Sequence, residues 1–94
     1  MLVVKVDKTV IRGAIDRYGH KHQMIVAIEE MSELTKELTK TLRGEQRREA
    51  VIEELADVLI CLLQVAQMFN ISNKELNHMI AAKAERLDRR MKEE

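Results

Sequence analysis

The chain is organised around two acidic clusters, EEMSEL at residues 29–34 and EELADV at residues 53–58, each inside an apolar run with helical spacing. Both clusters contain two carboxylates three residues apart, namely Glu30 with Glu33 and Glu54 with Asp57. In a helix, side chains three residues apart project from the same side within one turn. Each pair is therefore expected to present its oxygens to a common point.

Composition indicates a single all-α domain. The 94 residues include no proline and only three glycines, whereas average usage would give about five prolines. Hydrophobic residues make up 46% and charged residues 34% of the chain, which is typical of a soluble globular protein and excludes a largely disordered one. Because a chain of this length supports one modest core, we expect one domain over residues 1–94.

Charge and residue usage exclude several classes of protein. Sixteen basic and sixteen acidic residues cancel, so no general electrostatic signature of a nucleic-acid or anionic-membrane binder is present. Cys61 is the only cysteine, which excludes an intramolecular disulfide and a cysteine-based zinc site and fits a reducing setting. No apolar run approaches membrane-spanning length. We expect a cytoplasmic protein with no nucleic-acid or membrane partner.

The spacing of apolar residues predicts four helices after an extended lead-in over residues 1–6. The first is capped by Asp7 or Thr9 and runs to about Tyr18. The second covers residues 20–42 and ends at Arg43 and Gly44. The third runs from residue 45 or 48 to residue 69, and the fourth opens with a capping box made by Ser72 and Glu75.

Each helix carries an apolar stripe that is expected to face the core. The stripes are Val10, Ile11, Ala14 and Ile15 in the first helix, Met24, Ala27, Met31, Leu34, Leu38 and Leu42 in the second, Val51, Leu55, Val58, Leu59, Leu62, Val65, Ala66 and Phe69 in the third, and Leu76, Ile80, Ala84, Leu87 and Met91 in the fourth. Glu30, Glu33 and Glu37 border the second stripe and are expected to lie near the core but outside it. The third helix is apolar around most of its circumference and needs neighbours on several sides. The expected fold is an all-α four-helix bundle, a long helical hairpin plus flanking helices, completed by oligomerisation.

The two acidic pairs are expected to meet in one metal site. A single acidic pair at helical spacing is usually a solvated helix edge. In an antiparallel hairpin across Gly44, however, Glu33 and Glu54 lie at similar distances from the turn. Four converging carboxylates repel one another unless a cation neutralises them. Oxygen ligands without His or Cys favour Mg²⁺ or Mn²⁺ over zinc, and Mg²⁺ commonly takes substrate phosphate as a further ligand.

The two acidic motifs, together with Lys83 and Arg86 on the last helix, resemble the MazG-like branch of the all-α nucleoside triphosphate pyrophosphohydrolases from about Gln23 to Arg90. The resemblance implies a Mg²⁺-dependent homodimer or homotetramer that cleaves the α–β phosphate bond of a ribo- or deoxynucleoside triphosphate, releasing the monophosphate and pyrophosphate. House-cleaning of non-standard nucleotides is one task that this activity serves. Carried over by position, the catalytic residues and metal ligands are Glu30, Glu33, Glu54 and Asp57, and Lys83 and Arg86 hold substrate phosphate.

Alternatives remain at this point. A catalytically inactive oligomerisation or regulatory module would keep the same scaffold. Lys83 and Arg86 taken alone are equally compatible with a solvated helix edge, and Glu85 and Asp88 between the basic residues argue against nucleic-acid binding by the last helix. Cys61 is expected to be a small core residue and not a nucleophile, because no partner base is identifiable.

Overall fold

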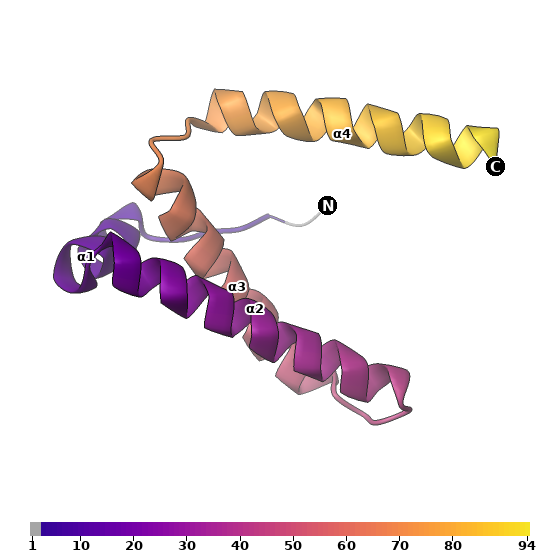
Figure 1. The fold of residues 1–94 in the computed structure, drawn as a ribbon, viewed down its shortest axis with the longest axis horizontal. Coiled ribbons are helices and arrows are strands. Elements are labelled where there is room, and N and C mark those ends of the chain that lie inside the picture. Colours follow the sequence, from indigo (N-terminus) through magenta and orange to yellow (C-terminus); the bar gives the residue numbers. More distant parts are fainter. Residues whose placement is uncertain (1–2) are drawn as a thin grey trace.

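Four α-helices make up the computed structural model, which describes residues 3–94 (Figure 1). They are α1 (Lys8–Tyr18), α2 (His20–Leu42), α3 (Arg48–Met68) and α4 (Asn73–Glu93). The described residues contain no strand, so the all-α class and the four predicted helices are confirmed. Residues 3–6 of the predicted extended lead-in belong to no helix or strand, and its first two residues lie outside the described part of the chain.

Local side-chain chemistry sets the helix ends. The Asp7 carboxylate accepts a hydrogen bond from the Thr9 amide at 2.8 Å and so caps α1. Gly19 separates α1 from α2 with a φ of +88°, a left-handed conformation that favours glycine. At the start of α4 the Ser72 hydroxyl accepts from the Glu75 amide, and the Glu75 carboxylate accepts from the Ser72 amide at 2.8 Å. This is the predicted capping box.

Helices α2 and α3 form an antiparallel hairpin. Gly44 lies in the turn with a φ of +92°. Near the closed end, Arg47 donates to Glu37 from Nε at 2.7 Å. Near the open end, Gln23 Nε2 donates to Gln64 Oε1 at 2.8 Å. Because early residues of α2 meet late residues of α3, the predicted hairpin across Gly44 is confirmed.

Helix α1 closes one end of the hairpin by packing on both α2 and α3. Ile11 and Ile15 are fully buried in this contact, with exposed fractions of 1% and 2%. The prediction that Val10 faces inward was wrong, since its side chain is 64% exposed. Val10 precedes Ile11 by one residue, and a step of about 100° around the helix turns it toward solvent.

The face of α2 that packs against α3 overlaps the predicted stripe only at Ala27, which is buried, and at Leu34, which is half-buried. Gln23, Ala27 and Glu37 are buried in it. The predicted inward positions Met24, Met31, Leu38 and Leu42 are exposed. The prediction was wrong for these four because they lie about 60–100° around the helix from the centre of the packed face. The expectation that Glu37 lies outside the core was also wrong.

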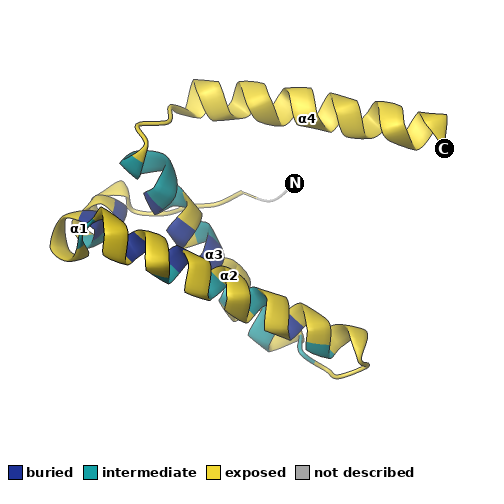
Figure 2. Ribbon diagram, in the orientation of Figure 1, coloured by how far each residue is buried: buried dark blue, intermediate teal, exposed yellow. Residues whose placement is uncertain are grey.

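Helix α3 turns Val58, Cys61 and Gln64 into the interior, as Figure 2 shows for the buried positions of the hairpin. The burial of Cys61 agrees with the prediction of a small core residue. Leu55, Leu62 and Phe69 remain exposed, so the predicted inward position was wrong for them within this chain. Much of the broad apolar surface of α3 is thus left exposed by the other helices of the described chain.

Helix α4 extends away from the other three helices and contacts none of them within residues 3–94 (Figures 1 and 2). Its predicted stripe is exposed, so the assignment of Leu76, Ile80, Ala84, Leu87 and Met91 as inward was wrong within this chain. The cause is the break between α3 and α4, where the axis bends by 119° and Asn70 takes a φ of +53°. In the described residues no single helix is long and apolar enough to span a membrane. Only α3 and α4 taken together, across their bend, meet these two requirements.

Candidate functional site

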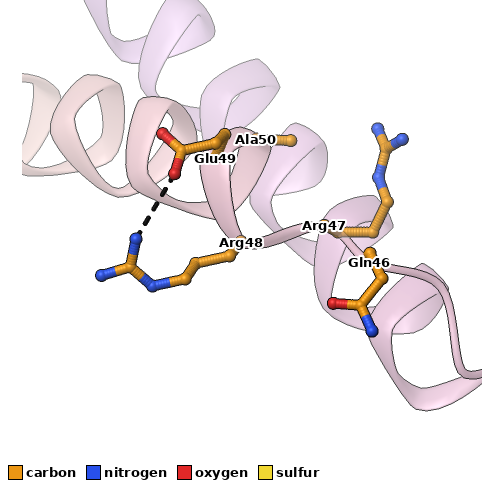
Figure 3. A pocket seen from close by; sticks show the side chains of 5 residues that line it. All are labelled: Gln46, Arg47, Arg48, Glu49 and Ala50. Atoms are coloured by element: carbon orange, nitrogen blue, oxygen red, sulfur yellow. Dashed lines mark hydrogen bonds and ion pairs between the residues drawn. The ribbon is translucent and has the colours of Figure 1, made fainter.

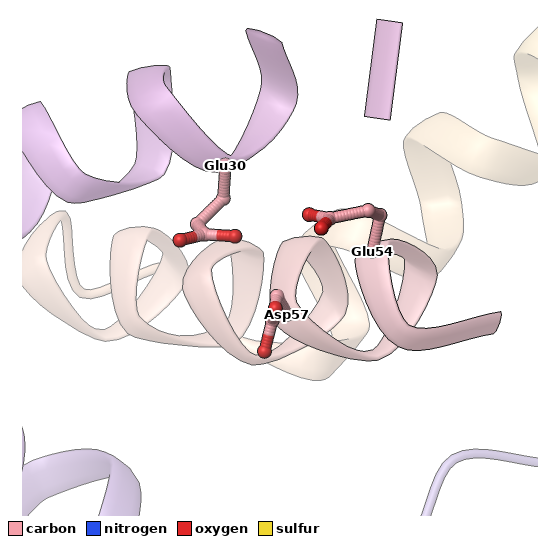
Figure 4. A group of neighbouring side chains, drawn as sticks. All are labelled: Glu30, Glu54 and Asp57. Atoms are coloured by element: carbon pink, nitrogen blue, oxygen red, sulfur yellow. The ribbon is translucent and has the colours of Figure 1, made fainter. Parts of the chain in front are cut away.

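Three carboxylates converge where α2 faces α3. Glu30 from α2 and Glu54 and Asp57 from α3 each offer an oxygen, and these oxygens lie within 4.8 Å of one another (Figure 4). Glu30 and Glu54 are half-buried, whereas Asp57 is exposed. We call these three residues the acidic cluster. The hairpin therefore brings together residues that are more than twenty positions apart in the sequence.

The acidic cluster is electrostatically unfavourable by itself. Burial raises the pKa of Glu30, and the neighbouring charges of Asp57 and Glu54 raise it further. Burial is also the main cause that raises the pKa of Glu54, followed by the charges of Asp57 and Glu33. Both carboxylates are thus held in a place that disfavours their ionised forms.

One oxygen of the acidic cluster lacks a hydrogen-bond donor among the described residues. Glu54 Oε2 is buried and has no hydrogen-bond donor among the residues that the structure describes. A buried carboxylate oxygen without a donor or cation is costly. A divalent cation among the three side chains would satisfy this oxygen and offset the repulsion, and oxygen-only ligands suit Mg²⁺ or Mn²⁺. The residues present therefore fit a hard divalent metal.

Glu33 lies beside the acidic cluster but is not one of its converging members. Its side chain is exposed and accepts a hydrogen bond from Lys36 Nζ at 3.2 Å, one turn along α2. It is still near enough for its charge to raise the pKa of Glu54. Of the four predicted ligands, the structure brings three together and places the fourth at the edge.

Lys83 and Arg86 are not brought to the acidic cluster within one chain. Both lie on α4, all of whose residues are exposed and which touches no other helix of the described chain. The assignment of a phosphate-binding role to Lys83 and Arg86 stays a prediction.

Cys61 lies one turn beyond Asp57 and is buried in the hairpin. Burial raises the pKa of the Cys61 thiol, and the charges of Glu30 and Asp57 raise it further. A higher pKa keeps the thiol protonated, which is unfavourable for a nucleophile.

A second concave surface lies at the start of α3. It is a hollow of about 390 Å³ lined by Gln46, Arg47, Arg48, Glu49 and Ala50 (Figure 3). Its ion pair between Arg48 and Glu49, at 3.3 Å, joins two highly exposed neighbouring side chains. None of the acidic-cluster residues lines it. We therefore place the candidate site at the cluster and not at this hollow.

Sequence reasoning missed two polar pairs that flank the acidic cluster. One is the buried hydrogen bond between Gln23 and Gln64, and the other is the ion pair between Glu37 and Arg47. A signal was present, because Gln23 and Glu37 each lie seven residues from Glu30 and hence on the same side of α2.

The family model of the MazG nucleotide pyrophosphohydrolase domain matches residues 18–93. The match runs from the last residue of α1 to the last residue of α4 and includes both acidic motifs. It confirms the resemblance drawn from those motifs. No curated protein and no solved structure matches the chain.

Proposed function

Because the chain belongs to the MazG nucleotide pyrophosphohydrolase domain family, we propose that it is a Mg²⁺-dependent nucleoside triphosphate pyrophosphohydrolase. The family supports nucleotide pyrophosphohydrolase activity, which is hydrolysis of a phosphoric anhydride. The proposal adds that the bond cleaved joins the α- and β-phosphates of a ribo- or deoxynucleoside triphosphate. We further propose house-cleaning of non-standard nucleotides as the task. The observation that carries the proposal is the acidic cluster with its unpartnered Glu54 oxygen.

Glu30, Glu54 and Asp57 would hold the cation, with Glu33 beside them as a fourth carboxylate. When bound, Mg²⁺ supplies charge neutralisation for the triphosphate and lowers the pKa of a water molecule. Mn²⁺ has the same preference for oxygen ligands and is expected to substitute. The Glu54 oxygen that lacks a donor in the protein is the first candidate ligand.

The carboxylates of the acidic cluster have two tasks in the proposed reaction. The acidic cluster would hold the cation that neutralises the triphosphate, and one of its carboxylates would accept the proton that the attacking water releases. The oxygen of that water forms the new bond to the α-phosphorus, and the α–β anhydride bond breaks to give the monophosphate and pyrophosphate. Cys61 takes no part, because its raised pKa keeps it protonated.

We also propose that the protein works as a homodimer or homotetramer in which α4 reaches a second copy. Within the described residues, Lys83 and Arg86 lie on a helix that touches no other helix and so are away from the acidic cluster, and Arg presents a donor fork suited to phosphate oxygens. The exposed apolar residues of α4 and those of α2 offer surface for such contact. In this arrangement α4 of one copy brings Lys83 and Arg86 to the triphosphate held at the acidic cluster of another.

Pyrophosphate release from a panel of nucleoside triphosphates tests the proposal. The purified protein is incubated with each standard ribo- and deoxynucleotide, and with oxidised or deaminated ones, in the presence of Mg²⁺. We expect release of pyrophosphate and the matching monophosphate from at least one of them, and none after chelation of the metal. If no nucleotide yields pyrophosphate at high protein concentration, the chain is an inactive oligomerisation or regulatory module instead.

A Glu54→Gln variant supplies the control. It removes one charge from the acidic cluster and keeps the size of the side chain, so helicity by circular dichroism should not change. We expect its Mg²⁺-dependent turnover to fall by more than about 100-fold, because a lost metal ligand costs at least as much as a lost outer-shell partner. Unchanged turnover would remove Glu54 from the site.

A further inference from the structure

The contact between α2 and α3 contains three polar layers at regular intervals. Gln23, Glu30 and Glu37 follow one another along α2 at steps of seven residues. Seven residues are about two helical turns, or roughly 10.5 Å. Across from them on the α3 side lie Gln64, then Asp57 and Glu54, then Arg47. The acidic cluster thus sits between a neutral amide layer and a charged layer, one on each side.

The amide layer is buried and directional. Gln23 and Gln64 are only 6% and 5% exposed, and Gln23 Nε2 donates to Gln64 Oε1 at 2.8 Å. Gln23 Oε1 lies 2.7 Å from His22 Nδ1, which donates to it in the tautomer protonated at that nitrogen. Both ends of the Gln23 amide are therefore engaged. Moving it away from Gln64 would leave buried polar groups without partners, which is unfavourable.

The charged layer is equally specific. Arg47 donates from Nε to Glu37 Oε2 at 2.7 Å and from its terminal nitrogen to Glu37 Oε1 at 3.1 Å. Glu37 is 8% exposed, so a shift that removed Arg47 would leave a buried carboxylate with only Lys40 at 3.4 Å. Two-point contacts between Arg and a carboxylate fix geometry as well as distance.

We call the surface where α2 packs on α3 the seam. The apolar contacts in the seam do not supply this specificity. Ala27 and Val58 are buried by contacts that have no required direction. Helix α2 also has the more apolar face formed by Met24, Met31 and Leu38, about 100° around its axis. Apolar burial alone would favour turning that face toward α3, and Glu30 would then point away from Glu54. A directional interaction is needed to hold α2 in the observed orientation.

We propose that Gln23 with Gln64 and Glu37 with Arg47 are positioning residues that set the register and rotation of α2 on α3 in which the acidic cluster forms. A slide of α2 by one turn is about 5.4 Å. Such a slide would separate both polar pairs at once. It is also longer than the 4.8 Å within which the oxygens of the acidic cluster lie. The consequence for metal binding rests on the proposed function, whereas the register itself can be measured without metal or substrate.

The test replaces both members of the amide layer, giving Gln23→Leu with Gln64→Leu. Exchanging two paired polar groups for apolar ones is near neutral or stabilising, so we expect helicity and Tm to be kept. The concentration of Mg²⁺ that half-saturates binding should nevertheless rise about 10-fold, the scale seen when groups that orient metal ligands are removed. The matched control is Gln67→Leu, because Gln67 lines a hollow near α1 and α3 and lies outside the seam. It should leave Mg²⁺ binding unchanged.

Distance measurements report the register independently of metal and activity. Spin labels are attached at Lys36→Cys and Glu53→Cys, both exposed, in a Cys61→Ala chain diluted with unlabelled protein so that only pairs within one chain are read. The parent chain should give one narrow distance distribution. The double leucine variant should give a broadened distribution or a displaced maximum, because a slide of one turn moves the two labels about 5.4 Å relative to each other along the helix axis. An unchanged distribution would overturn the proposal.

A second variant covers the case in which the double leucine chain does not fold. Gln23→Asn keeps the amide but shortens the side chain by one methylene, so it cannot reach Gln64 at 2.8 Å with the helices in place. We expect the same broadening of distances and weaker Mg²⁺ binding. A narrow, parent-like distribution in this variant would also overturn the proposal. Absence of nucleotide hydrolysis in the parent chain would refute the proposed function but leave the distance result interpretable.

Discussion

Glu37 and Arg47 hold the closed end of the hairpin through two hydrogen bonds of 2.7 and 3.1 Å, which join the last third of α2 to the residue just before α3. The pair spans only ten residues of sequence, with Gly44 between its members. Hydrogen bonds from Arg47 are the main cause that lowers the pKa of Glu37, against an opposing contribution from burial. The ionised form of Glu37 is therefore the form that the fold favours.

Glu37→Gln is expected to lower stability in a pH-dependent way. Because the pKa of Glu37 is lowered by folding, its contribution is fully present above its ordinary value of 4.5 and is lost as the pH falls through the lowered value. Thermal melts should show a Tm several degrees below the parent chain at pH 7, with the gap closing in acid. A gap of the same size at every pH would mean that the charge of Glu37 is not what matters.

Mg²⁺ is expected to stabilise the parent chain but not Glu54→Gln. A ligand that binds only the folded state at about 100 times its Kd adds about 2.7 kcal/mol to the free energy of unfolding. In the absence of metal at pH 7, Glu54→Gln should be more stable than the parent chain, because a carboxyl whose pKa is raised by folding opposes folding once it ionises. Thermal melts with Mg²⁺ and with a chelator measure both effects. Equal metal-induced shifts in the two chains would contradict the assignment of Glu54 as a ligand.

Two inactive chains are expected to restore activity together if α4 serves a second copy. One chain carries Glu54→Gln, and the other carries Lys83→Gln with Arg86→Gln. After joint unfolding and refolding, some assemblies combine an intact acidic cluster from one chain with an intact α4 from the other, so pyrophosphate release should return. Each chain refolded alone is the control. A mixture as inactive as its parts would exclude sharing of the site between copies.

Ile11→Ala is expected to loosen α1 from the hairpin. Truncation of a fully buried isoleucine costs about 2–5 kcal/mol, and Ile11 is 1% exposed. Val10→Ala is the neighbouring control, since its side chain is 64% exposed and such surface changes stay within about 0.5 kcal/mol. Chemical denaturation of the three chains measures the differences. Similar losses for both variants would show that Val10 is covered in solution.

The sequence predicted the features that depend on neighbouring residues. Asp7, Gly19 and the Ser72 and Glu75 pair act within one turn of the backbone, and each was found where expected. Three of the four predicted ligands were correctly expected to meet in one site, since the turn at Gly44 places the two motifs at similar heights along the hairpin. Site prediction thus relied on register along the helices more than on side-chain burial.

The face of α2 that packs against α3 was harder to predict. An apolar side chain indicates that a surface becomes covered, but it does not identify the partner that covers it. Met24 and Met31 are more apolar than Gln23 and Glu30, yet the latter two face α3. The decisive interactions are hydrogen bonds with Gln64 and Arg47, whose partners are distant in sequence or lie beyond the turn. Because buried polar groups need hydrogen-bond partners, a glutamine or a glutamate can be predicted to be buried only when its partner is known.

Helix α4 follows different thermodynamics from the rest of the chain. The hairpin and α1 are held by contacts inside one molecule, so their stability depends less on dilution than that of α4. Most helical stability in proteins comes from packing of an amphipathic face, and α4, 21 residues long, packs on no other helix of the described chain. At low protein concentration α4 should therefore fray and become the first target of proteases, while the hairpin endures. Loss of catalytic rate per chain on dilution would follow from the same cause, which would make the activity of this protein sensitive to its own abundance.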